Sequence, residues 1–135
     1  MISKKLSSLL KTVKTIAIVG ASSNPQRDSY KVMKFLIDYG YKVFPVNPNE
    51  ANKNILNRKC YSNLNDIKQK IDMVDVFRSS KHVFDIAKEA VSINADILWT
   101  QEGVTDDNAA DFAKKEGLIV IMNECPKKIL EKSFK

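Results

Sequence analysis

A chain of 135 residues, of which 44% are hydrophobic, is long enough for a core of its own, so we expect one domain over residues 1–135. No stretch approaches the roughly 20 apolar residues needed to cross a bilayer, and the first apolar run, at residues 6–10, is too short for a signal peptide, so we expect a cytoplasmic protein. The net charge of +6 is not gathered in a Lys/Arg-rich run, which argues against nucleic-acid binding. Cys60 and Cys125 lie far apart and form no C-x-x-C pair, which argues against a zinc site and a disulfide framework.

Short apolar runs alternate with amphipathic segments along the whole chain. A leading helix over 4–12 precedes a first strand, Thr15–Val19, and the next segment, 29–39, has apolar residues at helical spacing and ends at Gly40. The remaining predicted elements are a strand over Lys42–Val46, a polar loop over 47–62 with an extended piece at 59–61, a helix over 63–70, a strand over 73–77, a helix over 81–93 capped by Ser79 or Ser80, a strand over 96–100, a helix over 106–116, a strand over 118–122 and a short helix after Pro126.

Five strands, each followed by a helical segment, indicate a parallel sheet that is covered on both faces. Because crossovers are right-handed, few topologies remain. We predict an α/β fold, a Rossmann-like doubly wound sheet of five parallel strands in the order 3-2-1-4-5. Such sheets bind ligands outside the carboxyl ends of the strands, at a switch point that this order places between strands one and four. The predicted loops at that edge are 20–29, 46–50, 77–81, 100–106 and 123–127.

The first of these loops has the features of a phosphate-binding loop. Gly20 directly follows the first strand, which suits a tight turn and a close approach of the backbone to a ligand. Ser22, Ser23 and Ser29 offer hydroxyl groups and Arg27 offers a guanidinium group. The loop runs into a helix N-terminus, where free N–H groups and the helix dipole favour an anion. A plain strand-to-helix turn is the alternative interpretation.

The same region lacks the signature of an NAD site. The pattern G-x-G-x-x-G is absent, because Gly20 is followed by Ala21 and the next glycine is Gly40. The second strand ends in Val46-Asn47-Pro48, where NAD sites carry an acidic residue for the ribose hydroxyls. Asn47 could instead bond to an adenine edge or a ribose. An NAD(P)-dependent oxidoreductase-like dinucleotide binder is therefore the second hypothesis, and a nucleic-acid binder driven by the net charge is the third.

Four motifs follow one another over roughly residues 10–130: "IAIVGASSNPQRDSYKVMKFLIDYGYKVFPVNP", "VDVFRSSKHV", "WTQEGV" and "MNECPK". In this order they closely resemble the small stand-alone CoA-binding proteins of the YccU-like family, whose domain is similar to the CoA-binding domain of the succinyl-CoA synthetase alpha subunit. Asn57 and Asn94 stand where family members often have glycine. Asparagine tolerates the left-handed backbone best after glycine, so we expect both turns to be kept.

The resemblance implies a site for coenzyme A or acyl-CoA. The pyrophosphate would sit over residues 20–23 and the start of the following helix, the adenosine would border residues 47–48, and the pantetheine chain would follow the loops after the third and fourth strands. The cofactor-binding residues implied in this way are Gly20, Ala21, Ser22, Ser23, Arg27, Ser29, Asn47, Pro48, Arg78, Gln101 and Gly103.

No catalytic or metal-binding set accompanies these residues. The sequence shows no Ser/His/Asp arrangement and no paired carboxylates, and we expect His82, the one histidine, to be a polar surface residue. Ligase chemistry is not implied, because the phosphorylated histidine of the synthetase belongs to another domain. Arg78 could form a surface ion pair and Gln101 could stabilise a loop, whereas Phe77 and Trp99 are expected in the core. We predict a non-catalytic CoA-binding protein, acting as a carrier, sensor or regulator, without a membrane partner.

Cys125 directly follows the fifth strand and therefore lies at the predicted ligand edge. A thiol at a helix start, with Lys127 and Lys128 nearby, could have a lowered pKa and form a mixed disulfide with CoA. A buried, inert cysteine behind the strand is the other interpretation, since free cysteines are among the most buried residues.

Overall fold

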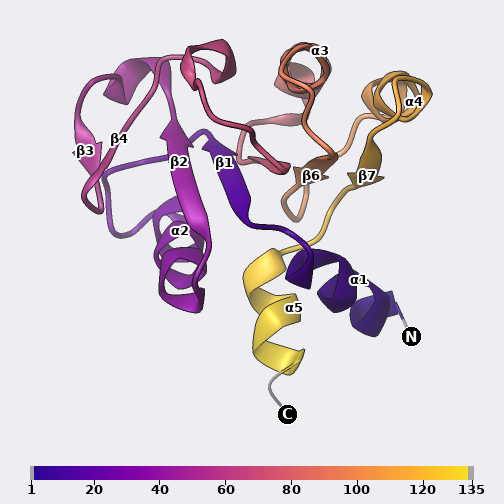
Figure 1. Ribbon diagram of the computed structural model, residues 1–135, viewed down its shortest axis with the longest axis horizontal. Helices are drawn as coiled ribbons and strands as arrows, with labels where there is room; N and C mark the ends of the chain where they lie inside the picture. Colours follow the sequence, from indigo (N-terminus) through magenta and orange to yellow (C-terminus); the bar gives the residue numbers. More distant parts are fainter. Residues whose placement is uncertain (1, 134–135) are drawn as a thin grey trace.

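A five-stranded parallel sheet forms the centre of the computed structural model, which describes residues 2–133 (Figure 1). The outermost strands of this sheet are β2 and β7, and β1 and β5 are neighbours at its middle. A small antiparallel hairpin branches from the connection between β2 and β5. The sheet consists of β2 (Lys42–Val46), β1 (Thr15–Val19), β5 (Met73–Val76), β6 (Ile97–Thr100) and β7 (Ile119–Ile121), in that spatial order, and the hairpin of β3 (Asn54–Ile55) and β4 (Arg58–Lys59).

Helices cover both faces of the sheet (Figure 1). One face carries α1 (Ile2–Lys11), α2 (Asp28–Tyr39) and α5 (Pro126–Ser133), and the other carries α3 (Val83–Ser92) and α4 (Asp107–Lys115). The terminal helices α1 and α5 lie against one another although they are at opposite ends of the chain. The loops hold three short 3-10 helices, η1 (Pro48–Glu50), η2 (Leu64–Asp66) and η3 (Ser80–His82).

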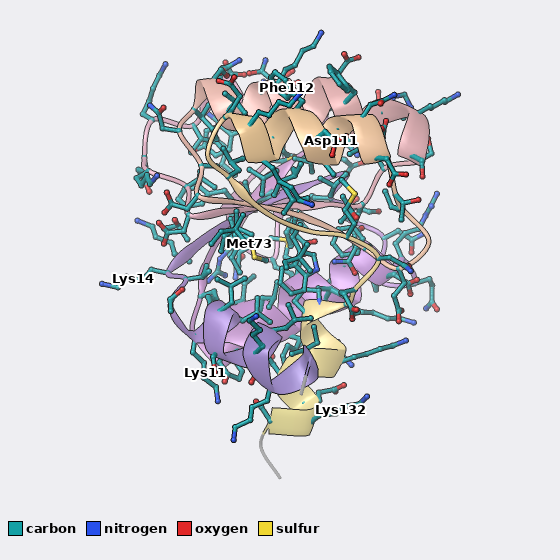
Figure 2. All side chains as sticks on the ribbon, turned by 90° about the vertical axis from the view of Figure 1, so that its right-hand side faces the viewer. Lys11, Lys14, Met73, Asp111, Phe112 and Lys132 are labelled. Carbon is teal, nitrogen blue, oxygen red and sulfur yellow. The ribbon has the colours of Figure 1, made fainter. Side chains whose placement is uncertain are left out.

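Each face has its own apolar cluster, and the strands supply both. In β1, Ile16 and Ile18 pack into the cluster beneath α2, while Ala17 and Val19 pack into the cluster beneath α3. This division follows from the alternation of side chains along a strand, and it explains why a central parallel strand is apolar throughout. Figure 2 shows Met73 at the middle of the molecule, whereas Lys11 projects outward.

The predicted fold class is confirmed, but the predicted strand order is wrong. Counted along the chain, the five strands have the order 2-1-3-4-5, because the third strand, β5, pairs with β1 and not with β2. The chain moves one way from β1 to β2 and then the other way from β2 to β5. Right-handed crossovers therefore put α2 on one face and the later connections on the other. The switch point lies between β1 and β5.

The segment predicted as a helix over 63–70 is only the 3-10 turn η2. Leu64, Ile67 and Ile71 have helical spacing and are buried beneath α3, but the chain between them is irregular. Farther along, α3 begins at Val83, two residues later than predicted, and the Ser80 hydroxyl accepts from the N–H of Thr105 instead of capping the helix.

The two predicted asparagine turns agree with the structure. Asn57 and Asn94 adopt the left-handed backbone, with φ of 65° and 61°. Asp106 caps α4, since its carboxylate accepts from the N–H of Ala109 at 3.0 Å. Among residues 2–133, no helix combines the length and the apolar character that a membrane span requires.

Candidate functional site

Two adjoining clefts lie at the carboxyl ends of the strands. The first, which we call the loop cleft, has a volume of about 660 Å³ and is lined by the β1–α2 loop, the start of α2 and the loop after β2. The second, the α5 cleft, has a volume of about 590 Å³ and lies between α2, the loops after β5 and β6, and the start of α5. Both are lined by Asp28, Phe77 and Arg78, so together they form one groove.

The groove brings together most of the residues that the sequence singled out. Ser23 and Pro48 are exposed and line neither cleft, and Gly103 lies outside both, where its N–H donates to Asn123 Oδ1. Arg78 lies between the two clefts and Gln101 lines the α5 cleft. The other predicted residues, Gly20, Ala21, Ser22, Arg27, Ser29 and Asn47, line the loop cleft.

Gly20 cannot carry a side chain where it stands. Its φ is 93°, and a Cβ there would lie 2.6 Å from the carbonyl oxygen of Phe77. The loop after β1 therefore packs directly against the loop after β5. Gly20 and Ala21 also donate from their N–H groups to the carbonyl oxygen of Val46, at 2.9 and 3.3 Å. These contacts hold the β1–α2 loop, which lines the loop cleft, against the ends of the neighbouring strands β2 and β5.

Asn47 has a structural role that the sequence did not indicate. Its Nδ2 donates to the carbonyl oxygen of Ala21 at 2.8 Å, and its Oδ1 accepts from the N–H of Asn49 at 2.9 Å. The amide thereby ties the β2 loop to the β1–α2 loop. One hydrogen and one lone pair of the amide remain for a ligand.

The start of α2 faces the loop cleft. Arg27 stands at the N-cap in an extended conformation, and its side chain makes no capping hydrogen bond. Ser29 is buried in the first turn and lines the cleft. The side chains of Arg27 and Arg78 bring positive charge to this helix N-terminus, which by itself favours an anion.

The loop cleft contains one acceptor, Glu50, that was not among the predicted site residues. Its Oε1 is buried and has no hydrogen-bond partner among the described residues. Buried carboxylate oxygens normally have partners. A ligand that brings a hydroxyl or amino group to Glu50 would supply the missing donor.

Cys125 lines the α5 cleft although it is only 8% exposed. Burial raises the pKa of its thiol, and the N–H groups of Lys127 and Lys128 offset this only in part. The direction of this shift is opposite to the lowered pKa of the first hypothesis. The thiol is buried, as in the second interpretation, but it borders the groove and does not lie behind the strand. Lys128 itself forms an ion pair with Glu102 at 2.8 Å.

A buried carboxyl group lies beside the groove, behind Gln101. Asp75 of β5 is completely buried, and Gln101 Nε2 donates to its Oδ1 at 2.6 Å. Its Oδ2 has no partner among the described residues. Burial raises the pKa of Asp75 to about 7, although the bond from Gln101 acts in the opposite direction. This group was not predicted from the sequence. The signal that could have found it is an acidic residue inside an apolar strand, in the stretch "MVDV".

The other candidate residues take simpler places. Trp99 is completely buried and its Nε1 donates to the carbonyl oxygen of Glu124 at 2.9 Å, which confirms its place in the core. Phe77 is half-buried and lines both clefts as well as packing against the core. His82 lies before α3 and lines neither cleft. Among the described residues, no group of three His, Cys, Asp or Glu side chains could hold a metal ion.

Known proteins show the same combination of sequence and fold. A family model described as "CoA binding domain" matches residues 14–131. The uncharacterized protein YneT of Bacillus subtilis (strain 168) is 38% identical over 125 residues, which cover 91% of this chain and 90% of YneT. An ADP-forming acetate–CoA ligase of Methanocaldococcus jannaschii is 37% identical over 120 residues, which cover 83% of this chain but 17% of the ligase. Among solved structures, a hypothetical protein from Pyrococcus horikoshii OT3 has a TM-score of 0.92 at 35% identity, covering 98% of this chain and 92% of that one.

Proposed function

This chain belongs to the family of CoA binding domains, and we propose that it binds coenzyme A or an acyl-CoA in the groove at the carboxyl edge of its sheet. The observation that carries the proposal is the continuity of the groove. A helix N-terminus with two arginines lies at one end, a cleft whose lining includes Val32, Phe77, Val104 and the Gln101 amide lies at the other, and Arg78 is shared between them. CoA has the matching construction, a charged nucleotide joined to a long, weakly polar arm.

In this proposal the pyrophosphate accepts hydrogen bonds at the start of α2 and from Arg27 and Arg78. Charge-assisted bonds of this kind are the strongest hydrogen bonds available to a protein. The pantetheine arm passes between Phe77 and Val104, which supply apolar surface, and its end reaches Gln101 and Cys125. The acidic Asp28 of the first helical turn borders both clefts and would repel the phosphates. We therefore expect the phosphates to lie close to Arg27 and Arg78.

We propose a binding role, as carrier, sensor or regulator, and not ligation of acetate to CoA. The ligase that resembles this chain is much longer, and the chain spans 17% of it. The one histidine of this chain lies outside the groove. The groove residues described above are suited to bind an anionic ligand.

A thermal-shift panel of CoA, acetyl-CoA, NAD, NADP and ATP tests this function. A ligand at 100 times its dissociation constant stabilises the folded state by about 2.7 kcal/mol, which is easily measured. We expect CoA or acetyl-CoA to raise the Tm and NAD to have a much smaller effect at the same concentration. Equal effects of NAD and CoA, or none from either CoA species, would contradict the proposal.

One observation favours a second candidate, a dinucleotide binder of the NAD type. Glu50 lies just after β2, close to where NAD sites place a carboxylate for the ribose hydroxyls, and its Oε1 lacks a partner among the described residues. Glu50→Gln separates the two candidates. If the dinucleotide hypothesis holds, this variant loses NAD-dependent stabilisation, whereas a CoA site that relies on the arginines keeps its CoA-dependent stabilisation.

A further inference from the structure

The amide of Gln101 links a completely buried carboxyl group to the groove. Gln101 lines the α5 cleft, and Asp75 lies behind it with no exposed surface. One end of the amide bonds to Asp75 Oδ1, so the other end is the part of Gln101 that a ligand meets. The protonation of Asp75 therefore decides which end that is.

Three features favour the neutral form of Asp75. The carboxyl group is fully buried, and ionisation would leave the charged Oδ2 without a donor among the described residues, which is costly. Its distance of 2.6 Å to the amide is short for an N–H donor, for which about 2.7–3.2 Å is usual, and suits an O–H donor. The nitrogen and oxygen of an amide exchange places by a half-turn without any other movement. A protonated Asp75 would then donate to Gln101 Oε1.

Among the described residues, no lysine, arginine or histidine forms an ion pair with Asp75. Ile18 and Trp99 are its register neighbours on the adjoining strands. Cys125, from the start of α5, lies near enough for the charge of Asp75 to raise the thiol pKa. The charged groups that line the α5 cleft come from α2, the loops after β5 and β6, and α5: Asp28, Lys31, Arg78, Glu102, Lys127 and Lys128.

The orientation of Gln101 decides what chemistry the cleft accepts. With Asp75 protonated, Nε2 of Gln101 points toward the cleft as a donor. With Asp75 ionised, Nε2 turns back to the carboxylate and Oε1 points toward the cleft as an acceptor. A thioester carbonyl can only accept a hydrogen bond, so it is matched by the first state. A free thiol is a weak donor and a weak acceptor, and gains little from either state.

We propose that Asp75 is a positioning residue that turns the Gln101 amide nitrogen toward the α5 cleft, so that the site prefers an acyl-CoA thioester over free CoA. This inference rests on the proposed CoA function and specifies its ligand class. Asp75 acts through Gln101 and does not touch the ligand.

Calorimetric titrations of the full chain with CoA, acetyl-CoA and S-ethyl-CoA test the inference. S-ethyl-CoA is a thioether of similar size that lacks the carbonyl oxygen. Because Asp75 has a pKa of about 7, the titrations are run from about pH 5 to about pH 9. Below about pH 6 we expect acetyl-CoA to bind roughly 3- to 10-fold more tightly than the other two ligands, the range that one hydrogen bond supplies. The preference should fall toward unity above about pH 8. All three ligands carry the same phosphates, so phosphate titration cancels in the ratio.

Two variants complete the test. Asp75→Asn keeps a neutral donor for Gln101 at every pH, so the preference for acetyl-CoA should persist at high pH. Gln101→Leu removes the amide and should bring the ratio to about one at every pH, which gives a second readout if the first variant folds poorly. If all ligands bind with equal affinity in the wild type, or if Asp75→Asn retains the wild-type pH profile, the inference is overturned while the CoA function stands. Absence of binding by all three ligands overturns the CoA function and the inference together.

Discussion

The backbone of Gly20 is held where three loops meet, and this single residue shows how closely the groove is built. Its φ of 93° and the 2.6 Å approach to the Phe77 carbonyl oxygen leave no room for a methyl group. This contact sets the β1–α2 loop against the loop that carries Arg78. Asp75, Cys125 and Gly20 each lead to a prediction that concerns one side chain.

Gly20→Ala should destabilise the protein by about 2 kcal/mol or more, because the left-handed conformation and the contact with Phe77 both oppose a Cβ. Gly103→Ala is the matched control, since Gly103 has a φ of 83° but, apart from its two chain neighbours, no described residue has an atom within 4 Å of its Cβ position. That variant should lose only about 1 kcal/mol. Urea unfolding measures both, and equal losses would show that the Phe77 contact is not a constraint.

Asp75 should make the stability depend on pH. Its pKa is about 7 in the folded state against an ordinary value of 3.8, so the folded state holds its proton more tightly than the unfolded state. This contribution to stability is complete below about pH 4, is lost as the pH rises toward 7, and amounts to roughly 4 kcal/mol. Asp75→Asn should remove this part of the pH dependence and be more stable than the wild type at about pH 8. Parallel stability curves for the two proteins between about pH 4 and 8 would contradict it.

Cys125 should report on occupancy of the groove. The thiol borders the α5 cleft but burial raises its pKa, so alkylation by iodoacetamide should be slow in the free protein and slower still with CoA bound. Cys60 is the internal control, since it is completely buried and lines neither cleft. Peptide mass spectrometry follows both thiols. Unchanged labelling of Cys125 at saturating CoA would place the ligand elsewhere.

At the scale of elements, the turn after α3 tests the role of asparagine in place of glycine. Asn94 has a φ of 61°, and the following N–H, of Ala95, donates to the carbonyl oxygen of Ala90 at 3.0 Å to close the helix. Asn94→Gly should leave the stability unchanged or raise it slightly, whereas Asn94→Ala should cost about 1 kcal/mol. Both are measured by thermal unfolding. A gain from alanine would mean that helix propensity outweighs the backbone conformation here.

Elements defined by local patterns could be predicted from the sequence, and contacts between distant segments could not. The β1–α2 loop was found because a glycine after an apolar strand is a local signal. The strand order was missed although Pro45 indicated it: proline is confined to edge strands, and β2 is an edge strand, whereas the predicted order placed it inside the sheet. Asp75 and Gln101 are 26 positions apart, so their hydrogen bond had no local pattern.

At the scale of the whole molecule, the fold brings five loop regions to one edge and the groove crosses them. The chain adds β2 on one side of β1 and then returns to add β5 on the other side. Gly20 follows β1 and Arg78 lies just after β5. Open parallel sheets bind ligands at such a switch point, because the adjoining loops diverge there. The net charge of +6 adds a general attraction for an anionic ligand, which salt should weaken.

The central claim is that CoA occupies this groove, and calorimetric titration of CoA into the full chain and two arginine variants tests it most directly. Arg78 and Arg58 are both half-buried, but only Arg78 lines the groove, while Arg58 lies on the hairpin and donates to the carbonyl oxygen of Leu56. We predict that Arg78→Ala weakens CoA binding by about 1.5–3 kcal/mol, roughly 10- to 150-fold, and that Arg58→Ala leaves it unchanged. Equal affinities of the wild type and Arg78→Ala, or no binding of CoA to the wild type, would contradict the account.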